Sequence, residues 1–424
     1  MKVLVVGSGG REHALLWKLR QSLDVTELYC APGNAGTRLV AENIFIPSVD
    51  RSALRKFALQ KRVDLTIFGS ELPLALGYAD YFAESGLAVV GPSQEAAQLE
   101  ASKVFAKHFM LEENIPTAAF AVFDDAPKAI AYVEGKRMPV VVKADGLAFG
   151  KGVTVCEMLA DAVAAIRACL VEGKFGKAGK RILVEKCLTG VELSYHCLIA
   201  GDTYLPFVLS QDYKRLSDRG MGPNTGGMGA RSPVPGTTEE LVEKIESRIV
   251  EPTIAGLAKR SISYNGVLYI GIMVVGGEPY ALEYNVRFGD PEGQVLLMRL
   301  KGDLFPLLWS VASGSSSGLE GKTAEFLRDA AVCTVASSAG YPDAKEYSSV
   351  PILGLEKAAA FPKTMIFHSG TRSVGDQIMT AGGRVLGVTS LARNSETAAR
   401  RIRHALSRIS FSGMHYRVDV GVDA

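Results

Sequence analysis

The chain has 424 residues, of which 47% are hydrophobic and 22% are charged, and its formal net charge is +2. This length predicts about two to four domains, and so small a charge gives no reason to expect nucleic acid or a membrane surface as a partner. No run approaches the roughly 18 apolar residues of a membrane span. The six cysteines form no CxxC pair, which is typical of a reduced, cytoplasmic protein.

Residues 1–100 alternate short apolar runs with helical patterns. Each run ends at a glycine or in a turn-rich loop, and this alternation predicts a doubly wound α/β domain with a parallel sheet. Ligands bind at the carboxyl ends of the strands in such sheets. The expected strands are Val3–Val6, Glu27–Cys30, Asp64–Phe68 and Ala88–Val90.

Residues 101–325 instead predict an α+β body, because runs of strands and a hairpin replace the alternation. The hairpin is expected to turn at Gly276-Gly277, and a Gly/Ser-rich stretch at 313–318 marks a boundary. Residues 326–424 are expected to form a small C-terminal domain. The expected elements are strands at 139–143, 181–185, 266–275, 279–287, 331–337 and 384–388, and a basic helix near 395–410.

The first candidate motif is GSGGREH at residues 7–13. A dinucleotide fingerprint needs GxGxxG, and Glu12 stands at the third glycine position. A glycine-rich turn from strand to helix still presents backbone N–H groups to an anion, and Arg11 adds positive charge. A tight turn without a ligand explains the glycines equally well.

The second motif is the glycine-rich run from Lys143 to Gly152. A lysine at the end of a strand can bind phosphate oxygens as a point charge, and the glycines allow the following loop to fold over a triphosphate. The run is not a P-loop, because Gly152 stands where Ser or Thr is required after Lys151. Phosphate binding is favoured over an ordinary turn.

Glu185 and Glu192 form a third candidate. A strand that ends near Glu185 can offer backbone groups to an adenine edge, and a carboxylate a few residues further on can accept hydrogen bonds from ribose hydroxyls. A solvated pair of charges is the alternative interpretation.

The fourth motif, EYNVRFGDPE at 283–292, gives the sharpest prediction. Alternation along a strand places Glu283, Asn285 and Arg287 on one face. A carboxylate and an amide oxygen suit magnesium, which usually keeps waters and substrate phosphates as its other ligands. Arg287 can then stabilise charge on a transferring phosphoryl group. This hypothesis is favoured over a polar solvent-facing strand.

The fifth motif combines SQDYKR at 210–215 with GPNTGGMG at 222–229. Asp212 can accept a proton or a hydrogen bond from an amine, and the glycine-rich loop can surround a small substrate. A flexible surface loop, which glycine and asparagine also favour, is an equally good explanation.

The motifs resemble, in this order from Met1 to about Val422, those of the phosphoribosylamine–glycine ligase family of the ATP-grasp superfamily. The stretches that carry the resemblance are GSGGREHAL, APGNAGT, KADGLAFGKGV, SQDYKR, GPNTGGMGA and EYNVRFGDPEGQ. The resemblance implies an N-terminal α/β domain, an ATP-grasp body with a mobile lid at about 120–190, and a C-terminal domain. It also implies ATP-dependent ligation of glycine to 5-phosphoribosylamine in purine biosynthesis, through a glycyl phosphate intermediate.

The resemblance implies a role for each motif. ATP and Mg²⁺ or Mn²⁺ are the expected cofactors, with Glu283 and Asn285 as metal ligands and Arg287 and Asp212 as catalytic residues. The expected ATP-binding residues are Lys103, Lys143, Gly150, Lys151, Gly152, Glu185, Lys186, Leu188 and Glu192. The expected substrate-binding residues are Gly9, Gly10, Arg11, Gly33, Asn34, Gly36, Asn224, Thr225, Gly226, Gly227 and Arg287.

Several positions depart from the pattern of the family. Ser70 replaces a proline, Lys186 an acidic residue, and Val191 a glutamate, but Glu71, Glu185 and Glu192 are retained. Two other hypotheses remain: a different carboxylate–amine ligase of the same fold, and a nucleotide sensor without turnover. The N-terminal loops distinguish the first of these from the family activity, and the complete polar face of the fourth motif argues against the second.

Overall fold

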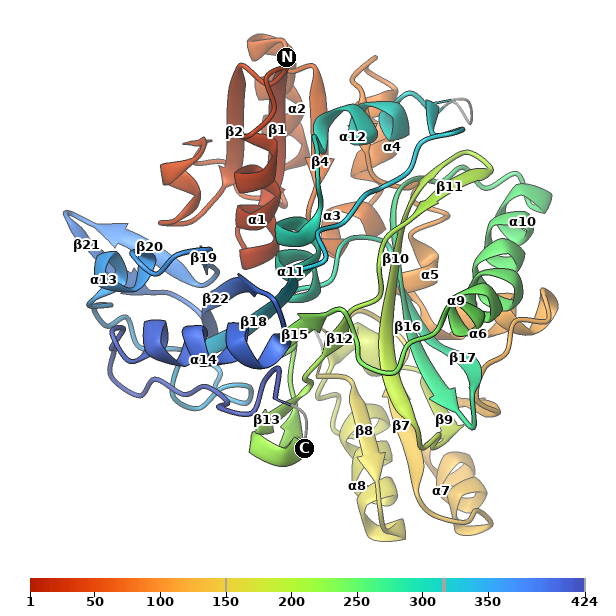
Figure 1. The fold of residues 1–424 in the computed structure, drawn as a ribbon. Coiled ribbons are helices and arrows are strands. Elements are labelled where there is room, and N and C mark those ends of the chain that lie inside the picture. Colours follow the sequence, from red (N-terminus) through yellow and green to blue (C-terminus); the bar gives the residue numbers. More distant parts are fainter. Residues whose placement is uncertain (149–150, 315–317, 423–424) are drawn as a thin grey trace.

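The computed structural model describes residues 1–148, 151–314 and 318–422. Its N-terminal part is a parallel five-stranded sheet in the order β3-β2-β1-β4-β5 (Figure 1). The strands are β1 (Lys2–Gly7), β2 (Glu27–Pro32), β3 (Glu42–Asn43), β4 (Leu65–Phe68) and β5 (Val89–Val90), and the helices are α1 (Gly10–Leu19), α2 (Arg51–Lys61), α3 (Glu71–Ala75) and α4 (Tyr78–Ala83).

Alternating side chains of β1 enter two different cores. Val3 and Val5 pack with α1 residues such as Leu15, whereas Leu4 and Val6 lie in the core that includes Leu54 of α2 and residues of α4. Because successive strand residues point to opposite faces, helices on both faces explain why β1 is apolar at every position from Val3 to Val6. The predicted doubly wound sheet is confirmed.

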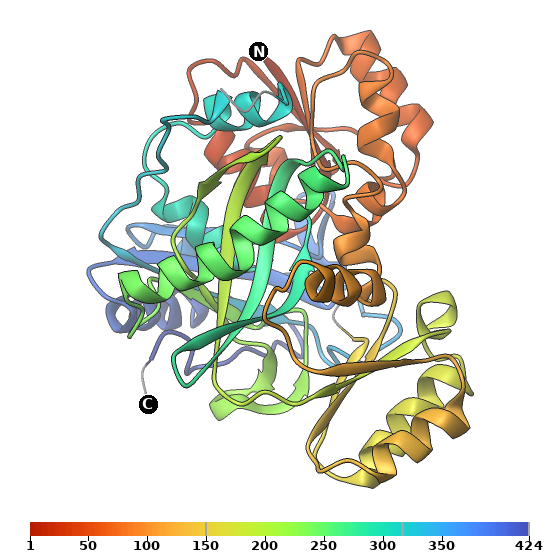
Figure 2. The same cartoon turned by 90° about the vertical axis from the view of Figure 1, so that its right-hand side faces the viewer.

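The central body contains an antiparallel sheet in the order β11-β10-β16-β17. Helices α9 and α10 cover one face of this sheet and α12 packs against the other (Figure 2). The bounds are β10 (Val191–Ala200), β11 (Thr203–Pro206), β16 (Asn265–Val275), β17 (Glu278–Asn285), α9 (Glu239–Ile245), α10 (Glu251–Lys259), α11 (Glu292–Arg299) and α12 (Phe305–Ala312). The predicted hairpin is β16–β17, and its turn is at Gly276-Gly277.

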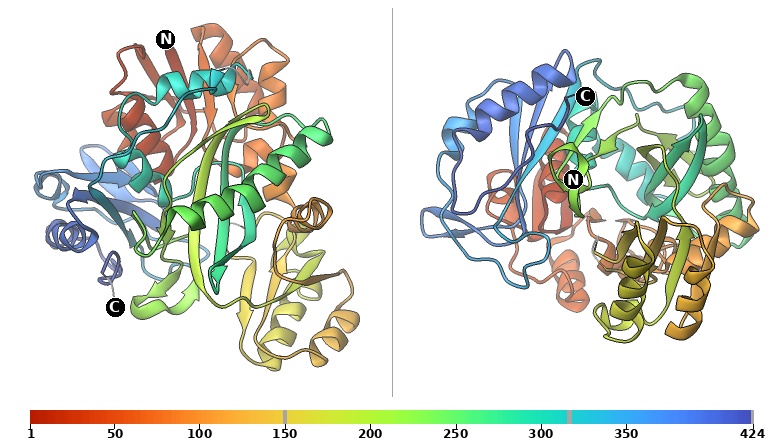
Figure 3. Two further views of the ribbon diagram at one scale, coloured as in Figure 1. Left: turned by 45° about the vertical axis from the view of Figure 1, so that its right-hand side comes forward. Right: turned by 90° about the horizontal axis from the view of Figure 1, so that it is seen from below.

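The described residues between 120 and 186 form a separate lobe with a core of its own (Figure 3). Its four-stranded antiparallel sheet has the order β6-β9-β7-β8, and α7 and α8 pack on it. The elements are β6 (Phe120–Phe123), α7 (Ala126–Glu134), β7 (Val140–Ala144), β8 (Val153–Cys156), α8 (Leu159–Leu170) and β9 (Ile182–Lys186); α5 (Gln98–Ala101) and α6 (Lys103–Glu112) precede the lobe.

The C-terminal sheet includes two strands that come from the central part of the chain. Its order is β12-β15-β18-β22-β19. Helices α13 and α14 lie in the core on one side of it. The elements are β12 (Gln211–Asp212), β13 (Arg215–Ser217), β14 (Met221–Asn224), β15 (Gly229–Ser232), β18 (Ala330–Ser337), α13 (Leu355–Ala359), β19 (Thr364–His368), β20 (Thr371–Val374), β21 (Gln377–Thr380), β22 (Arg384–Ala392) and α14 (Ser395–Leu406).

The pairing of β15 with β18 ties the C-terminal sheet to the segment that carries the fifth sequence motif. The two short strands β12 and β15 flank a glycine-rich loop, so the sequence pattern alone did not indicate them. Among the described residues, none of the helices has the length and apolar character needed to cross a membrane.

Candidate active site

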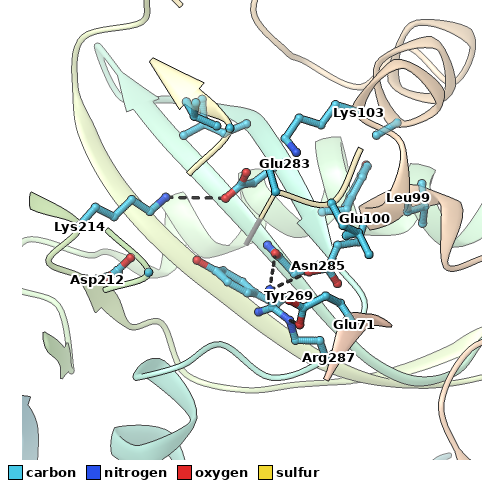
Figure 4. Close-up of a pocket in the computed structure, with 18 of the residues that line it drawn as sticks. Glu71, Leu99, Glu100, Lys103, Asp212, Lys214, Tyr269, Glu283, Asn285 and Arg287 are labelled. Atoms are coloured by element: carbon cyan, nitrogen blue, oxygen red, sulfur yellow. Dashed lines mark hydrogen bonds and ion pairs between the residues drawn. The ribbon is translucent and has the colours of Figure 1, made fainter. Parts of the chain in front are cut away.

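Two adjoining cavities lie where the N-terminal sheet, the β16–β17 hairpin, the lobe and the C-terminal sheet meet. The first, of about 300 Å³, is lined by charged side chains and is shown in Figure 4. The second, of about 430 Å³, lies between the lobe and the body, and its walls include Val141, Val155 and Met273. Asp212, Lys214, Thr225, Glu185 and Glu283 line both cavities.

The fourth motif forms one wall of the polar cavity. Glu283 and Asn285, on β17, and Arg287, just beyond it, all line this cavity. The alternate residue Tyr284 points into the core, where its hydroxyl group lies 2.7 Å from that of Thr253. Burial of the apolar side of the strand therefore forces the polar side chains toward the cavity.

Glu283 lies among cations. Lys214 Nζ is 3.8 Å from Glu283 Oε1, and Figure 4 shows Lys103 reaching toward the same carboxylate from the other side. Although burial alone would raise it, attraction to Lys214, Lys143 and Lys103 lowers the pKa of Glu283 below its usual value. The group is therefore ionised, as a metal ligand must be.

These two side chains fit a divalent metal that completes its coordination with nucleotide oxygens. Asn285 Oδ1 accepts one hydrogen bond, from Arg287 Nη2 at 3.1 Å, and a carbonyl oxygen has a second lone pair for a cation. The described residues contain no group of three or more His, Cys, Asp or Glu side chains suited to a metal. A small oxygen set that leaves positions for water and phosphate is typical of magnesium.

Arg287 is fixed by the buried Glu100 and the half-buried Glu71. Its Nη2 donates to Glu100 Oε1 at 2.7 Å, and its Nε donates to Glu71 Oε2 at 3.3 Å. Burial raises the pKa of Glu100 to about 7 despite the attraction of Arg287. The guanidinium group thus has a defined position in the cavity before any ligand arrives, which is what electrostatic stabilisation of a transition state requires.

The predicted phosphate lysine is held by a buried carboxylate. Glu185 Oε2 lies 2.9 Å from Lys143 Nζ and 3.1 Å from Lys107 Nζ. Burial lowers the pKa of Lys107 to about 8, although Glu185 opposes this shift. The side chain of Glu185 therefore belongs to an ion cluster, and Lys107, one helical turn after Lys103, is a cavity residue that the motif search missed.

The start of the glycine-rich loop caps helix α6. Asp145 Oδ1 accepts from Val104 N at 2.9 Å and from Ser102 Oγ at 2.8 Å, while its other oxygen pairs with Arg181. This capping places Lys103, the first residue of α6, on the wall of the polar cavity. Of the loop's predicted ATP-binding glycines, Gly152 lines the same cavity, whereas Gly150 lies outside the described residues. Lys151 is exposed.

The second cavity contains most of the predicted nucleoside-binding residues. Lys186, the last residue of β9, and Leu188, just beyond that strand, lie on the wall of this cavity, and Glu192 stands nearby at the start of β10. Lys214 Nζ contacts the carboxylate of Glu192. Burial alone would lower the pKa of Lys214, but the attraction of Glu192 and Glu283 outweighs it and raises that pKa well above its usual value. A permanently charged lysine therefore connects the two cavities.

Asp212 presents a buried oxygen to both cavities. Its Oδ1 has no hydrogen-bond partner among the described residues. Burial and the nearby Glu292 raise the pKa of Asp212 well above its usual value. Glu292 itself accepts from Ser194 Oγ at 3.2 Å, and Ser194 is also 3.2 Å from the hydroxyl of Tyr269, a further cavity residue. A carboxyl with a raised pKa is a stronger base than ordinary aspartate.

The predicted substrate-binding residues differ in whether their side chains line a cavity. Arg11, Thr225 and Gly226 line the polar cavity, and Asn224 lines the second one. The side chain of Asn34 is engaged with the backbone, because its Nδ2 donates to Ser8 O and His368 O at 2.8 Å each, and its Oδ1 accepts from Gly36 N at 2.8 Å.

The remaining glycines pack closely against neighbours. A Cβ atom at Gly10 would lie 2.7 Å from both Gln294 Nε2 and Ser369 Oγ, and one at Gly36 would lie 2.5 Å from His13 Cε1. At Gly9 the added atom would be 3.3 Å from Asp290 Oδ2, a cavity residue. Gly33 has a φ of +72°, and a Cβ atom there would clash with Asn43. Gly227 has a φ of +107°, and a Cβ atom there would clash with Pro291.

Sequence reasoning did not find several side chains of the polar cavity. Lys107 was detectable, because residues four apart in a helix share a face and Lys103 was already predicted. Arg384 was not, because it reaches the cavity from the C-terminal sheet. Glu292 ends the fourth motif but was given no role there, and Glu100 and Tyr269 stand in contexts that give no local signal.

A cleft between a small antiparallel lobe and an antiparallel body, lined with lysines and acidic side chains, is typical of the ATP-grasp class of enzymes. Models of three parts of one family match the chain: "Phosphoribosylglycinamide synthetase, N domain" at residues 1–100, its "ATP-grasp (A) domain" at 101–293, and its "C domain" at 331–423. The chain belongs to the phosphoribosylglycinamide synthetase family.

Full-length relatives agree with this assignment. The chain is 46% identical to the phosphoribosylamine–glycine ligase of Allochromatium vinosum over 99% of this chain and 98% of that protein. It is 43% identical to that of Vibrio cholerae, over 100% and 98%. The crystal structure of the Thermotoga maritima phosphoribosylamine–glycine ligase matches with a TM-score of 0.84 at 30% identity, over 99% of this chain and 100% of that one.

A more distant structure shares the fold. The biotin carboxylase domain of the Hydrogenobacter thermophilus 2-oxoglutarate carboxylase, solved with MgADP and bicarbonate, matches with a TM-score of 0.74 at 17% identity, over 98% of this chain and 91% of that one. At this identity the likeness concerns the arrangement of the chain only.

Proposed function

We propose that this chain catalyses the reaction of its family, the ATP-dependent ligation of glycine to 5-phosphoribosylamine in purine biosynthesis. The products are glycinamide ribonucleotide, ADP and phosphate. The observation that carries this proposal is the convergence of Glu283, Asn285 and Arg287 on one cavity, beside Lys103 and Lys214. This set provides both metal ligands and cations for a transferring phosphoryl group.

The second cavity is the proposed site for the nucleoside of ATP. Its apolar walls suit a purine, and the chain at the end of β9, from Lys186 to Leu188, offers backbone groups to the adenine edge. Glu192 is the proposed acceptor for ribose hydroxyls. Lys103 and Lys143 would bind the phosphates, with Gly150, Lys151 and Gly152 in the loop that covers them.

Glu283 and Asn285 are the proposed ligands of Mg²⁺ or Mn²⁺. Such an ion, when bound, neutralises charge on the β- and γ-phosphates and orients them for transfer. Arg287, already oriented by Glu71 and Glu100, would meet the negative charge that develops on the phosphoryl oxygens. Both oxygen ligands suit either metal.

Glycine and 5-phosphoribosylamine are the proposed occupants of the polar cavity. The γ-phosphoryl group first passes to the glycine carboxylate, which is otherwise a poor electrophile, and makes a glycyl phosphate. The amine nitrogen then attacks the acyl carbon and displaces phosphate. Asp212, with its unpartnered buried oxygen and raised pKa, would accept the proton that the nitrogen loses.

The phosphoribosyl group is proposed to lie on the side of the N-terminal domain. Arg11 is on the cavity wall there. The loops of Gly9 and Gly10 and of Gly33, Asn34 and Gly36 would surround the sugar phosphate through their backbones, and Asn224, Thr225, Gly226 and Gly227 would close the opposite side. We also propose the divisions 1–100, 101–325 and 326–424, with a lid at about 120–190.

Phosphate release on mixing ATP, glycine and 5-phosphoribosylamine with the purified chain tests this function. Release that requires all three substrates, with glycinamide ribonucleotide detected by mass spectrometry, is the expected result. Release with glycine and a different amine would instead identify another ligase of this fold. ATP binding without release under any of these conditions would contradict the proposal and favour a nucleotide sensor.

A further inference from the structure

Gly226 is held on both sides of its backbone by side chains of the C-terminal part of the chain. Its N–H donates to the hydroxyl of Tyr341 at 2.9 Å. Its carbonyl oxygen accepts from Nη1 of Arg384 at 2.5 Å. A Cβ atom at position 226 would lie 3.3 Å from both Arg384 Cζ and Tyr341 Oη, so the two side chains enclose the glycine.

Arg384 also holds the turn that follows the metal-ligand strand. Its Nη1 donates to the carbonyl oxygen of Asp290, and its Nη2 is 3.3 Å from Oδ2 of the same residue. One guanidinium group therefore connects three segments: the loop at Gly226, the turn at Asp290 and strand β22. Asp290 in turn lies beside Gly9, where an added Cβ would be 3.3 Å from its carboxylate.

The enclosed loop continues to the proposed catalytic base. Thr225 Oγ1 donates to Lys214 O at 2.8 Å and accepts from Gly227 N at 3.0 Å. A Cβ atom at Gly227 would lie 3.0 Å from Asp212 Oδ1. A shift of the loop at Gly226 would therefore displace the wall of the polar cavity next to Asp212. Asn224 and Thr225 of the loop also line the second cavity, but its proposed adenine side, at Lys186 and Leu188, is formed by another segment.

We propose that Tyr341 and Arg384 are positioning residues for ligation, which hold the loop at Gly226 in the shape that binds 5-phosphoribosylamine. The inference rests on the proposed function, because it assigns this substrate to the polar cavity. The C-terminal domain thereby takes part in substrate binding through a loop of the central body. Hydrogen bonds from a charged donor are stronger than those between neutral groups, so loss of the guanidinium contacts has a measurable effect.

Steady-state kinetics of Arg384→Met, Arg384→Lys and Tyr341→Phe test the proposal. In Arg384→Met, the KM for 5-phosphoribosylamine should rise at least tenfold, while the KM values for ATP and glycine stay within twofold of wild type. Arg384→Lys should recover part of the loss, because a lysine can still donate to one carbonyl oxygen. Arg372→Lys, at an exposed position of the same domain, is the matched control and should resemble wild type.

A double-mutant cycle separates positioning from general stabilisation. If both side chains act through the backbone of the one residue Gly226, the effects of Tyr341→Phe and Arg384→Lys on this KM will not add. Additive effects, or equal rises in all three KM values, would overturn the inference. Absence of ligation by the wild-type chain would instead contradict the proposed function. Should Arg384→Met not fold, the two conservative variants still decide the outcome.

Discussion

The ammonium nitrogen of Lys143 lies 2.9 Å from the buried Oε2 of Glu185, and the same oxygen is 3.1 Å from Lys107. The negative charge of the Glu185 carboxylate compensates the positive charges of both lysines in a region from which water is largely excluded. Because the ion cluster fixes Lys143 at the junction of the lobe and the body, its charge is available to an anionic ligand without a rearrangement of the side chain.

Lys143→Ala should therefore weaken ATP binding more than glycine binding. Loss of a charged contact to phosphate is expected to reduce ATP affinity by about 2 kcal/mol, roughly thirtyfold. Isothermal titration calorimetry measures both affinities, with Lys136→Ala as the control because Lys136 is exposed just after α7. Unchanged ATP affinity would mean that the glycine-rich loop is only a structural turn.

Glu283→Gln should leave the fold intact and impair catalysis. The substitution keeps the shape of the side chain but removes an anionic ligand, and a loss of about 3 kcal/mol of transition-state stabilisation corresponds to roughly a hundredfold in rate. Turnover at saturating magnesium is the measurement. Glu278→Gln, on the same strand but paired with Lys244 and Arg248, controls for general effects on β17. Wild-type turnover in Glu283→Gln would contradict the assignment of Glu283 as a metal ligand.

The lobe at residues 120–186 should close over bound ATP. It has its own core, distinct from those of the body, so it can move as a unit, and an acyl phosphate must be shielded from water. Hydrogen exchange of residues 140–190 is expected to slow when ATP is added. Equal protection with and without ATP would contradict a closing lid.

Two buried histidines should make the chain sensitive to acid. His368 N donates to His13 Nδ1 at 2.9 Å, so this contact between α1 and β19 requires neutral His13. Burial, together with His368, lowers the pKa of His13 from 6.5 to about 3, and burial lowers the pKa of His368 to about 4. The unfolded chain binds these protons below pH 6.5, so the free energy of unfolding falls as the pH drops from about 6.5 toward 4.

His13→Asn is designed to remove part of that dependence, because an amide oxygen can accept the same hydrogen bond without titrating. Between pH 7 and pH 5, wild type should lose roughly 2 kcal/mol more stability than this variant. Urea unfolding at the two pH values measures the difference, and His404→Asn, at an exposed position of α14, is the control. An identical pH dependence of wild type and His13→Asn would show that the histidine contact does not govern acid stability.

The sequence predicted those parts of the fold whose signals are local. The apolar run at Val3–Val6 and the Gly276-Gly277 turn each predicted an element that the structure confirms. Alternation predicted that Glu283, Asn285 and Arg287 face one cavity, and they do, although β17 ends at Asn285, two residues before the predicted end of the strand. This part was predictable because the period of a strand depends only on neighbouring residues.

Contacts between distant segments were not predictable in this way. Arg384 and Gly226 are 158 positions apart, and nothing near either residue indicates the other. The pairing of β15 with β18 is likewise invisible in the pattern, since β15 has only four residues and follows a glycine-rich loop. Asn34 was predicted to bind substrate, but its amide is engaged with the backbone, so any substrate contact there is proposed for the loop's backbone.

The transfer of oxygen-18 from glycine to phosphate tests the central claim most directly. If the γ-phosphoryl group passes to the glycine carboxylate and phosphate is then displaced by the amine, one carboxylate oxygen leaves with the phosphate. Ligation with [carboxyl-¹⁸O]glycine, followed by mass spectrometry of the released phosphate, should therefore find the label in phosphate. Unlabelled phosphate would contradict the glycyl phosphate mechanism and indicate phosphorylation of the sugar substrate, and label in AMP would indicate adenylation.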